Sequence, residues 1–376
     1  MAKNIFVLTE VELIKVGTMT VLASLLFGMT GLAIMIFLQW ITRQTYAADV
    51  VDKHGISHVS ASRLGGAAVF VSSLCMLIIG SFSMSFDSSY GPLGIHLFGW
   101  VGALSCAALG LVEDLYNDRL SPRFRLLSKF FLFAAIIAFW PYLIPVSLGV
   151  PPLDALLALP LVGWALTVIF CVGFINAVNM ADGANGLMPG ILTIAFGLFY
   201  LETNSLLYAN LLTACGLFTI FNVISGRLFL GDAGTYGLGA ALALSGLYLN
   251  SKGVFSAAFL AVLFAYPCID FVVSLSRRAL QGRSILLPDN DHLHNRVYFQ
   301  FKRLVKSKTA ANSLTGCSIA LLFSGVALCG YFCDWLPVDS NQWAWIFAVQ
   351  WAGYFGLFWL CGINRPLSQH VVQSSQ

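Results

Sequence analysis

Carboxylate side chains gather where one long apolar segment of this chain ends. Glu113 and Asp114 stand side by side after that segment, and Asp118 follows four residues later. Carboxylates at the end of a membrane span are costly unless water, a cation or a metal ion compensates them. The cluster is therefore either a solvated helix end or a site for cations and phosphates. Three acids and the basic residues up to Lys129 within one short stretch favour the site.

A second polar segment, residues 176–187, has the sequence NAVNMADGANGL. Asn176, Asn179 and Asp182 are spaced by three residues, so they share one face if the helix continues through them. Amide and carboxylate oxygens are hard ligands that suit Mg²⁺, ribose and phosphate groups. A polar turn between two spans is the alternative, but a simple turn needs neither these side chains nor Asn185 and the glycines beside it.

A third segment, residues 229–239, places Asp232 between Gly231 and Gly234 at the edge of an apolar run. Glycines allow a phosphate group to approach the backbone closely, and Asp232 is suited to hold a metal ion. Turns of this composition are common, so an ordinary turn is an equally good explanation of this segment taken alone.

The longest polar stretch, residues 277–304, combines an arginine cluster that includes Arg283 with His292 and His294. Arginine and imidazole groups donate hydrogen bonds to phosphate oxygens. The arginines also fit a loop whose charge only sets membrane topology, but topology does not require the histidines. We expect residues 276–311 to form a substrate-binding loop.

A fifth segment, residues 52–66, offers Lys53, His58 and Arg63 before a pair of glycines. It is either a further part of the site or a polar connection between spans.

The composition indicates what must position these groups. Of the 376 residues, 58% are hydrophobic and 10% are charged, whereas soluble domains carry about 25% charged residues. The net charge of +3 gives no concentrated basic face of the kind that binds nucleic acid. We predict an all-α polytopic membrane protein, one domain over residues 1–376, with about eleven spans near 14–40, 64–86, 97–113, 126–147, 155–175, 187–203, 206–224, 235–250, 253–275, 312–334 and 342–362.

The basic residues predict the orientation of these spans. Loops after the odd-numbered spans, with the C-terminus, hold 17 of the 20 Lys and Arg residues. Positive residues concentrate on the cytoplasmic side of membrane proteins. The N-terminus is therefore predicted to be extracytoplasmic and the C-terminus cytoplasmic. The five polar segments fall on the same cytoplasmic side, and Ser121 and Pro122 there predict the start of a helix.

In this order, the five segments resemble the polyprenyl-phosphate N-acetylhexosamine-1-phosphate transferases. The resemblance covers about residues 40–305, and Pro288–Arg296 looks closest to the O-antigen and enterobacterial common antigen initiators. The chain departs from the family pattern at several positions. Glu113 stands where the family usually has Asp, Asn185 stands for a second Asp, Asn295 replaces a third histidine, and the prolines expected near Arg63 are absent.

The resemblance implies transfer of a sugar phosphate, by default GlcNAc 1-phosphate, from a UDP-sugar to undecaprenyl phosphate. The expected setting is a bacterial inner membrane and lipopolysaccharide biosynthesis, with Mg²⁺, or Mn²⁺ in its place, as the cofactor. The assembly is left open, with a homodimer as one option. The implied roles are catalysis by Glu113, Asp114 and Asp232, metal binding by Asn179 and Asp232, and substrate binding by Lys53, His58, Asp118, Lys129, Asn176, Asp182, Asn185, Arg283, His292 and His294.

A secondary transporter is the main alternative from another class, and a non-catalytic membrane scaffold is a second. Transporters place ionisable residues near the bilayer midplane, whereas nearly all acids of this chain lie at span ends. Asp270 is the exception, and the sequence suggests that it pairs with Arg277.

Overall fold

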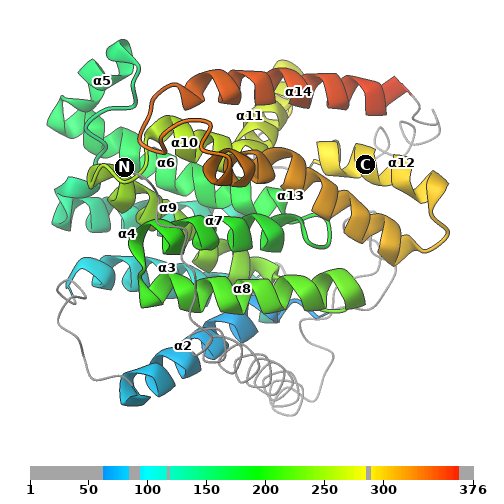
Figure 1. Ribbon diagram of the computed structural model, residues 1–376, viewed down its shortest axis with the longest axis horizontal. Coiled ribbons are helices and arrows are strands. Elements are labelled where there is room, and N and C mark those ends of the chain that lie inside the picture. Colours follow the sequence, from blue (N-terminus) through cyan, green and yellow to red (C-terminus); the bar gives the residue numbers. More distant parts are fainter. Residues whose placement is uncertain (1–61, 84–93, 117–118, 285–288, 364–376) are drawn as a thin grey trace.

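The computed structural model describes residues 62–83, 94–116, 119–284 and 289–363, and these residues are almost entirely helical (Figure 1). The helices of the described part are α2 (Gly65–Ser83), α3 (Gly94–Leu115), α4 (Pro122–Phe139), the 3-10 turn η1 (Pro141–Leu143), α5 (Pro151–Leu157), α6 (Pro160–Ala181), α7 (Leu187–Thr203), α8 (Leu206–Ser225), α9 (Gly231–Ser251), α10 (Ala257–Leu263), α11 (Ala265–Leu280), α12 (Leu293–Leu304), α13 (Lys308–Phe332) and α14 (Trp343–Ile363). Extended backbone pairs in them only at an isolated bridge between Ser62 and Leu228. The prediction of an all-α chain agrees with this architecture.

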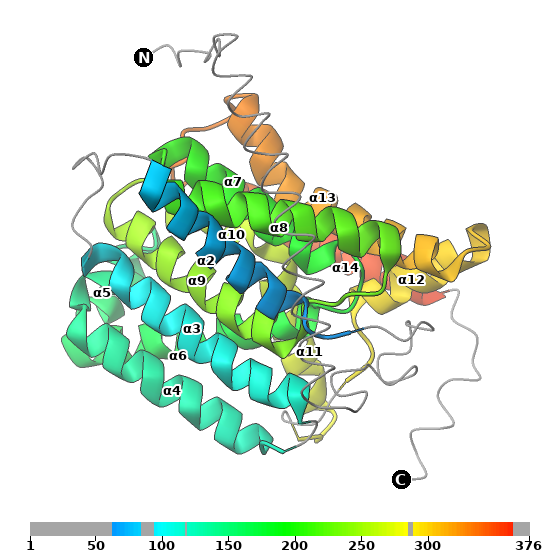
Figure 2. The ribbon, with the colours of Figure 1, turned by 90° about the horizontal axis from the view of Figure 1, so that it is seen from below.

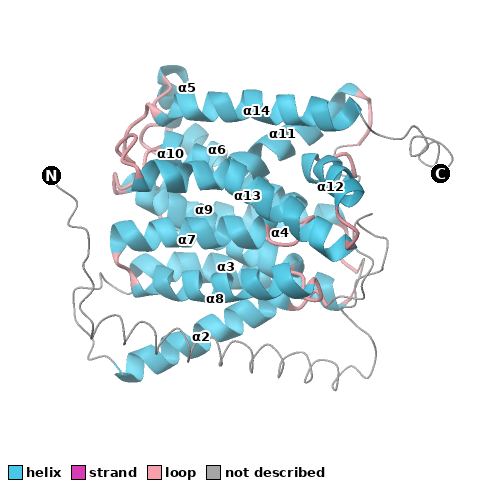
Figure 3. Cartoon of the chain, turned by 45° about the vertical axis from the view of Figure 1, so that its right-hand side comes forward, coloured by secondary structure: helices cyan, strands magenta, loops and turns pink. Residues whose placement is uncertain are grey.

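The long helices run side by side, with their connections gathered at two opposite ends (Figure 3). The most extensive pairings join α3 to α9 and α7 to α8, and α2 lies between α8 and α9 (Figure 2). One continuous set of buried apolar side chains extends from α2 to α14. Large apolar side chains such as Phe131, Leu161 and Trp345 are exposed on the outside, as expected for a surface that faces lipid.

Among the described residues, α6, α8, α13 and α14 are each long and apolar enough to cross a membrane. The bent pair α10 and α11 brings this number to five if it forms one span. The total of eleven spans and the orientation of the two termini stay predictions. The first predicted span, residues 14–40, lies outside the described residues.

The predicted span 253–275 is broken in the structure. Helices α10 and α11 meet at an angle of 80°. The cause is Pro267, which has no N–H to donate to the carbonyl group of Leu263, four residues earlier. That carbonyl group instead accepts the Ser324 hydroxyl of α13 at 2.6 Å. The sequence interpretation treated this segment as one straight helix and missed the break.

Prolines also move two other predicted boundaries. The span predicted at 126–147 ends at Phe139, because Trp140 precedes Pro141 and leaves the helical region at φ −126° and ψ 71°. The span predicted at 155–175 is divided by Pro160, which starts α6 after the short helix α5. The predicted loop 276–311 likewise holds the end of α11 and all of α12.

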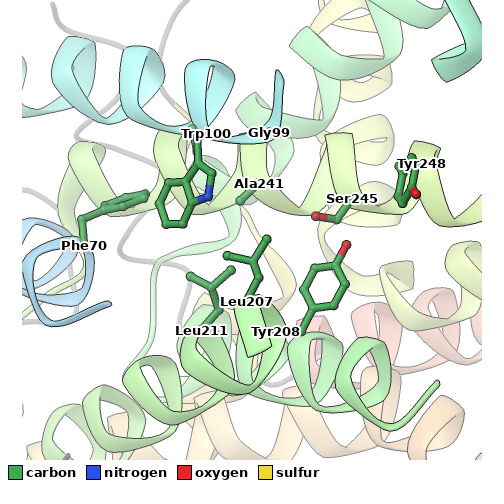
Figure 4. Close-up of a pocket in the computed structure, with 10 residues that line it drawn as sticks. Phe70, Gly99, Trp100, Leu207, Tyr208, Leu211, Ala241, Ser245 and Tyr248 are labelled. Atoms are coloured by element: carbon green, nitrogen blue, oxygen red, sulfur yellow. The ribbon is translucent and has the colours of Figure 1, made fainter. Parts of the chain in front are cut away.

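A small cavity lies between α2, α3, α8 and α9 (Figure 4). Its lining includes Phe70, Trp100 and Leu211, and the side chains of Tyr208 and Ser245 point toward each other across it (Figure 4). The lining contains no charged side chain. It lies toward the start of α3 and the end of α9, away from the acidic residues at the opposite ends of those helices.

The approach of α2 to α9 depends on glycine. A Cβ atom at Gly66 would overlap the backbone of Gly234 and approach the carbonyl oxygen of Leu230 to 2.7 Å. The Gly66 N–H also donates to that carbonyl group at 2.8 Å. The start of α2 is therefore held directly against the turn that precedes Asp232.

We expect Gly66→Ala to lower the thermal denaturation midpoint of the detergent-solubilised protein. Inserting a methyl group into backbone contacts of this kind costs about 1–3 kcal/mol. Gly99→Ala is the matched control, because a Cβ atom there meets nothing within 4 Å. Equal midpoints for the two variants would contradict the proposed close contact.

Candidate active site

Asp232 opens helix α9, and the turn before it is built for close packing. Gly231 has φ +71°, which is unfavourable for residues with a side chain. A Cβ atom there would also overlap the carbonyl oxygen of Arg63 and lie 2.7 Å from a carboxylate oxygen of Asp114. Glycine at position 231 therefore allows three chain segments to meet beside Asp232.

The carboxylate of Asp114 holds this helix end in place. Its two oxygens accept the backbone N–H groups of Asp232 at 2.9 Å and Ala233 at 2.8 Å. The first N–H groups of a helix have no partner within the helix, and a negative charge there is favoured by the helix dipole. Asp114 is only 1% exposed. Its contacts are those of a residue that positions Asp232, and its predicted catalytic role stays a prediction.

Asn179 lies near the end of α6 and meets the Asp232 carboxylate. Its side-chain amide donates to Asp232 Oδ1 at 2.7 Å and to the Thr235 hydroxyl at 2.8 Å. The two residues predicted to hold a metal ion are therefore brought together, although they are 53 positions apart in the chain.

Arg125 joins the acidic groups of two helices. Its guanidinium lies 3.2 Å from Glu113 Oε1 and 3.5 Å from Asp232 Oδ2. Arg125 projects from the first turns of α4, where the Ser121 hydroxyl caps the helix by accepting Phe124 N–H at 3.2 Å. The cap predicted from the sequence is confirmed. One cation thus compensates two carboxylates. Glu113 is 5% exposed, and Asp232 is half-buried.

A second cation, Lys129, lies one turn further along α4 and is 1% exposed. Its ammonium group donates to Asn176 Oδ1 at 2.6 Å and lies 3.9 Å from the centre of the Tyr236 ring. Lys129 therefore sits between α6 and α9, next to the carboxylate cluster. The sequence predicted both Lys129 and Asn176 as substrate-binding residues, and the structure brings the two together.

Asp182 ends α6 and turns toward the same centre. Burial and the nearby Asp232 carboxylate raise the pKa of Asp182 to about 7. Gly183 follows, and a Cβ atom there would overlap Nε2 of His294. The histidine predicted on the distant polar stretch is thus packed against the turn that carries Asp182.

Asn185 has different surroundings. Its backbone N–H donates to Asn312 Oδ1 at 3.0 Å and its side-chain amide to the Ser313 hydroxyl at 3.4 Å. These contacts fasten the turn to α13. Its predicted contact with the donor substrate stays a prediction, and the observed contacts are structural.

Together, Glu113, Asp114, Asn179 and Asp232 form a cluster that we call the acid–amide centre. The family model for glycosyl transferase family 4 matches residues 96–250, the segment that contains all four. Residues 96–250 of this chain are therefore similar to members of that family. The description of the family and the names of the relatives described next indicate a phosphotransferase.

Three relatives show the extent of the similarity. A probable undecaprenyl-phosphate N-acetylglucosaminyl 1-phosphate transferase of Bacillus subtilis is 27% identical over 261 residues, which are 67% of this chain and 69% of that protein. Phospho-N-acetylmuramoyl-pentapeptide-transferases of Levilactobacillus brevis and Staphylococcus carnosus are 29% and 24% identical. These matches cover 50% and 73% of this chain, and 61% and 89% of the respective relatives.

The acid–amide centre holds only part of a set of ligands for a metal ion. Among the described residues, no group of three acidic, histidine or cysteine side chains could hold a metal ion. Mg²⁺ is usually bound through one or two carboxylates together with substrate phosphates and water. Asp232 supplies one carboxylate of such a set, and Asn179 lies beside it with its amide N–H groups directed at Asp232 and Thr235. A magnesium ion at Asp232 would therefore also need oxygen ligands from a phosphate substrate and water.

The remaining predicted residues divide into three groups. Arg283 is exposed beyond the end of α11, away from any contact described for the acid–amide centre. His292 is 6% exposed, and both ring nitrogens face acceptors within the protein. These contacts are those of a positioning residue, and the predicted contact of His292 with substrate stays a prediction. Lys53, His58 and Asp118 lie outside the described residues.

The predicted pair of Asp270 with Arg277 is wrong. Asp270 is bonded to His292 and Tyr354, and Arg277 pairs with Asp289. Helical spacing placed Arg277 one or two turns beyond Asp270. The residues before α12 instead supply His292 to Asp270 and Asp289 to Arg277.

Sequence reasoning also left out Arg125, Asp270 and Tyr354 as site residues. Arg125 was visible as one of several basic residues near the first acidic cluster. Asp270 was visible as an acid within an apolar run, whereas Tyr354 gave no signal because its role depends on a contact 84 positions away.

Asp114→Asn should lower both the thermal midpoint and the turnover of the enzyme. An amide can accept only one of the two backbone N–H groups through oxygen, and the loss of such a cap costs about 1–2 kcal/mol. Turnover should fall because Asp232 is the residue that the cap positions. The comparison is Asp154→Asn. Asp154 also accepts a backbone N–H, that of Leu148, but it is distant in the sequence from the residues of the acid–amide centre. A turnover for Asp114→Asn no lower than for Asp154→Asn would show that the cap does not serve the reaction.

Proposed function

We propose that this chain transfers N-acetylhexosamine 1-phosphate, GlcNAc 1-phosphate in the first place, from a UDP-sugar to undecaprenyl phosphate. An oxygen of the lipid phosphate forms a bond to the β-phosphorus of the UDP-sugar. The bond from that phosphorus to the oxygen bridging to the α-phosphorus breaks, and UMP leaves. The product is a lipid pyrophosphate that carries the sugar and begins a cell-surface polysaccharide.

The observation that carries this proposal is the acid–amide centre with its two cations. Glu113, Asp232 and Asn179 come from three helices and meet at one end of the bundle, with Arg125 between the two acids. Phosphoryl transfer depends mainly on positioning and on compensation of negative charge. A site of this kind needs both hard oxygen ligands for a metal ion and cations for phosphate oxygens. The cluster supplies both.

The proposed roles follow from the contacts. Mg²⁺ held by Asp232 and Asn179 would supply positive charge to the diphosphate oxygens of the donor. Arg125, which already contacts Asp232, is placed to exchange a carboxylate partner for a phosphate oxygen. Lys129, fixed by Asn176, adds a second positive charge beside it. Asp182 and the turn that follows it are proposed to hold the nucleotide-sugar.

The arrangement of helix ends supports a cytoplasmic location for the site. The C-terminal ends of α3 and α6 and the N-terminal ends of α4 and α9 meet at the acid–amide centre. The sequence places the basic loops on the same side, which the positive-inside rule assigns to the cytoplasm. A donor nucleotide is soluble in the cytoplasm and a prenyl phosphate lies in the membrane, so a site at this boundary reaches both.

Two donors are worth comparing directly. The name of the Bacillus subtilis relative specifies an N-acetylglucosaminyl 1-phosphate transfer, and the names of the other two specify a phospho-N-acetylmuramoyl-pentapeptide transfer. The PDNDHLHNR stretch favours the first donor, because it resembles the O-antigen initiators more than the peptidoglycan enzyme.

The deciding assay combines purified protein, UDP-GlcNAc, undecaprenyl phosphate and Mg²⁺, and measures UMP release and the lipid product. We expect turnover that stops when the metal is chelated and that is lost in Asp232→Asn, while this variant still inserts into the membrane. UDP-N-acetylmuramoyl-pentapeptide, offered in parallel, should give little UMP. A transporter or a scaffold would release none from either donor, and wild-type turnover in Asp232→Asn would remove Asp232 from the site.

Glu113 should tolerate shortening better than loss of charge. Glu113→Asp keeps a carboxylate near Arg125 and should retain activity within about tenfold of wild type. Glu113→Gln loses the charge, and we expect turnover to fall by about 10². This loss is at the lower end of the rate effects of acid–base residues. We expect a small effect because a phosphate monoester with a second pKa near 6 is already largely ionised at pH 7. Comparable kcat values for Glu113→Gln and wild type would exclude a role for the carboxylate in the reaction.

A further inference from the structure

A buried carboxylate on α11 serves a set of contacts that the acid–amide centre does not include. Asp270 is 1% exposed. Its Oδ2 lies 2.6 Å from His292 Nδ1, and its Oδ1 accepts the Leu293 N–H at 3.1 Å and the Tyr354 hydroxyl at 2.7 Å. Three donors around one carboxylate stabilise its ionised form.

The partner, His292, carries a proton on each ring nitrogen. Its Nε2 lies 2.9 Å from the carbonyl oxygen of Asp289, which can only accept a hydrogen bond. Its Nδ1 faces the ionised carboxylate of Asp270 and donates to it. Burial by itself lowers the pKa of His292, but Asp270 and Asp289 outweigh this effect and raise it. The acceptors at both ring nitrogens therefore favour the imidazolium form of His292.

This cation is connected to the candidate site through a second ring. The rings of His292 and His294 stack with centroids 5.3 Å apart and planes 3° from parallel. His294 Nδ1 is bonded to the Tyr266 hydroxyl at 2.7 Å. The other side of the His294 ring fills the space where a side chain at Gly183 would stand. A continuous path of contacts thus leads from α14 to the turn next to Asp182.

We propose that Asp270 and Tyr354 are positioning residues, which hold His292 as an imidazolium so that His294 is fixed against the Gly183 turn. This inference rests on the proposed function, because the turn is taken there as part of the nucleotide-sugar site. Tyr354 lies on α14 and Asp270 on α11, both outside residues 96–250 that the family model matches.

The charged network fixes the orientation of a side chain, which apolar packing would not do. Burying an ion pair contributes little to stability on balance, and apolar residues of the same volume often pack as well or better. An imidazolium, by contrast, keeps one orientation through two fixed hydrogen bonds. Further titratable or charged groups surround the pair on each neighbouring element, namely Tyr266 and Arg277 on α11, Asp289 and Asp291 in the loop, His294 and Arg296 on α12, and Tyr354 on α14.

The first test compares two buried tyrosines. Tyr354→Phe removes the hydroxyl that donates to Asp270 and keeps the ring, which stacks on Phe358 at 5.8 Å. The control is Tyr298→Phe, because the Tyr298 hydroxyl is buried without a hydrogen-bond partner. We expect Tyr354→Phe to raise KM for the UDP-sugar about tenfold, the size of one hydrogen bond to a charged group, with KM for the prenyl phosphate unchanged. The control should match wild type.

A merely structural role of Tyr354 would give another result. Loss of folded enzyme lowers the maximal rate for both substrates and leaves both KM values in place. An unchanged KM for the UDP-sugar in Tyr354→Phe would therefore overturn the proposal.

The second test is the pH dependence of kcat/KM for the UDP-sugar. Because the folded pKa of His292 is raised, the imidazolium persists to higher pH and is lost as pH rises through that value. Wild-type activity should fall on this alkaline limb. Asp270→Asn removes the negative charge that raises the pKa, so the limb should move to lower pH. A limb that stays in place in a folded Asp270→Asn variant would contradict the proposal.

A direct measurement separates this inference from the proposed function. In protein labelled with ¹⁵N-histidine, the His292 signals are identified by their absence in His292→Gln. Both ring nitrogens of His292 should be protonated at pH values above the usual histidine pKa of about 6.5, with or without substrate. If both nitrogens are protonated and no donor is turned over, the proposed function is wrong, but the proposed contacts of Asp270, His292 and Tyr354 are supported. If only one nitrogen is protonated, the network fails whatever the turnover.

Discussion

The approach of helices α2, α3 and α9 around one buried carboxylate is the constraint on which the rest of the site depends. Asp114 fastens the first turn of α9, and Gly66 and Gly231 let the backbones come close enough for this. A buried carboxylate without partners would cost several kcal/mol. Two backbone N–H groups and the positive end of a helix dipole offset that cost. The orientation of Asp232 follows from this arrangement.

The compensation of charge explains why so many polar groups can gather at one end of an apolar bundle. Glu113 and Asp232 share Arg125, and Lys129 is held by an amide and an aromatic ring. Each cation therefore has a partner in the absence of substrate, and none has to be buried alone. In the proposed function, a phosphate substrate with a metal ion would bring charges of both signs. Arg125 could then change partners without leaving a carboxylate uncompensated.

The sequence predicted the parts of this arrangement that depend on local composition. Apolar length alone located α7 at residues 187–203 and α8 close to 206–224, and Ser121 with Pro122 correctly marked the start of α4. The convergence of Asn179 and Asp232 followed from the resemblance, because spacing cannot show that residues from two helices meet. The break at Pro267 was missed, since the apolar run continues through it and only the missing N–H divides the helix.

Asp270 shows most clearly where reasoning along one chain segment ends. Helical spacing offered Arg277 as its partner, whereas the fold gives it His292 from the next loop and Tyr354 from α14. Arg277 is used by the same loop, since it pairs with Asp289, whose carbonyl group accepts from His292. Asp289 and His292, just before α12, are thus both joined to α11 by pairs of opposite charge. Because α14 supplies the Tyr354 hydroxyl, and Phe358 lies 3.5 Å beneath the guanidinium of Arg296, the C-terminal helix is part of what shapes the histidine region.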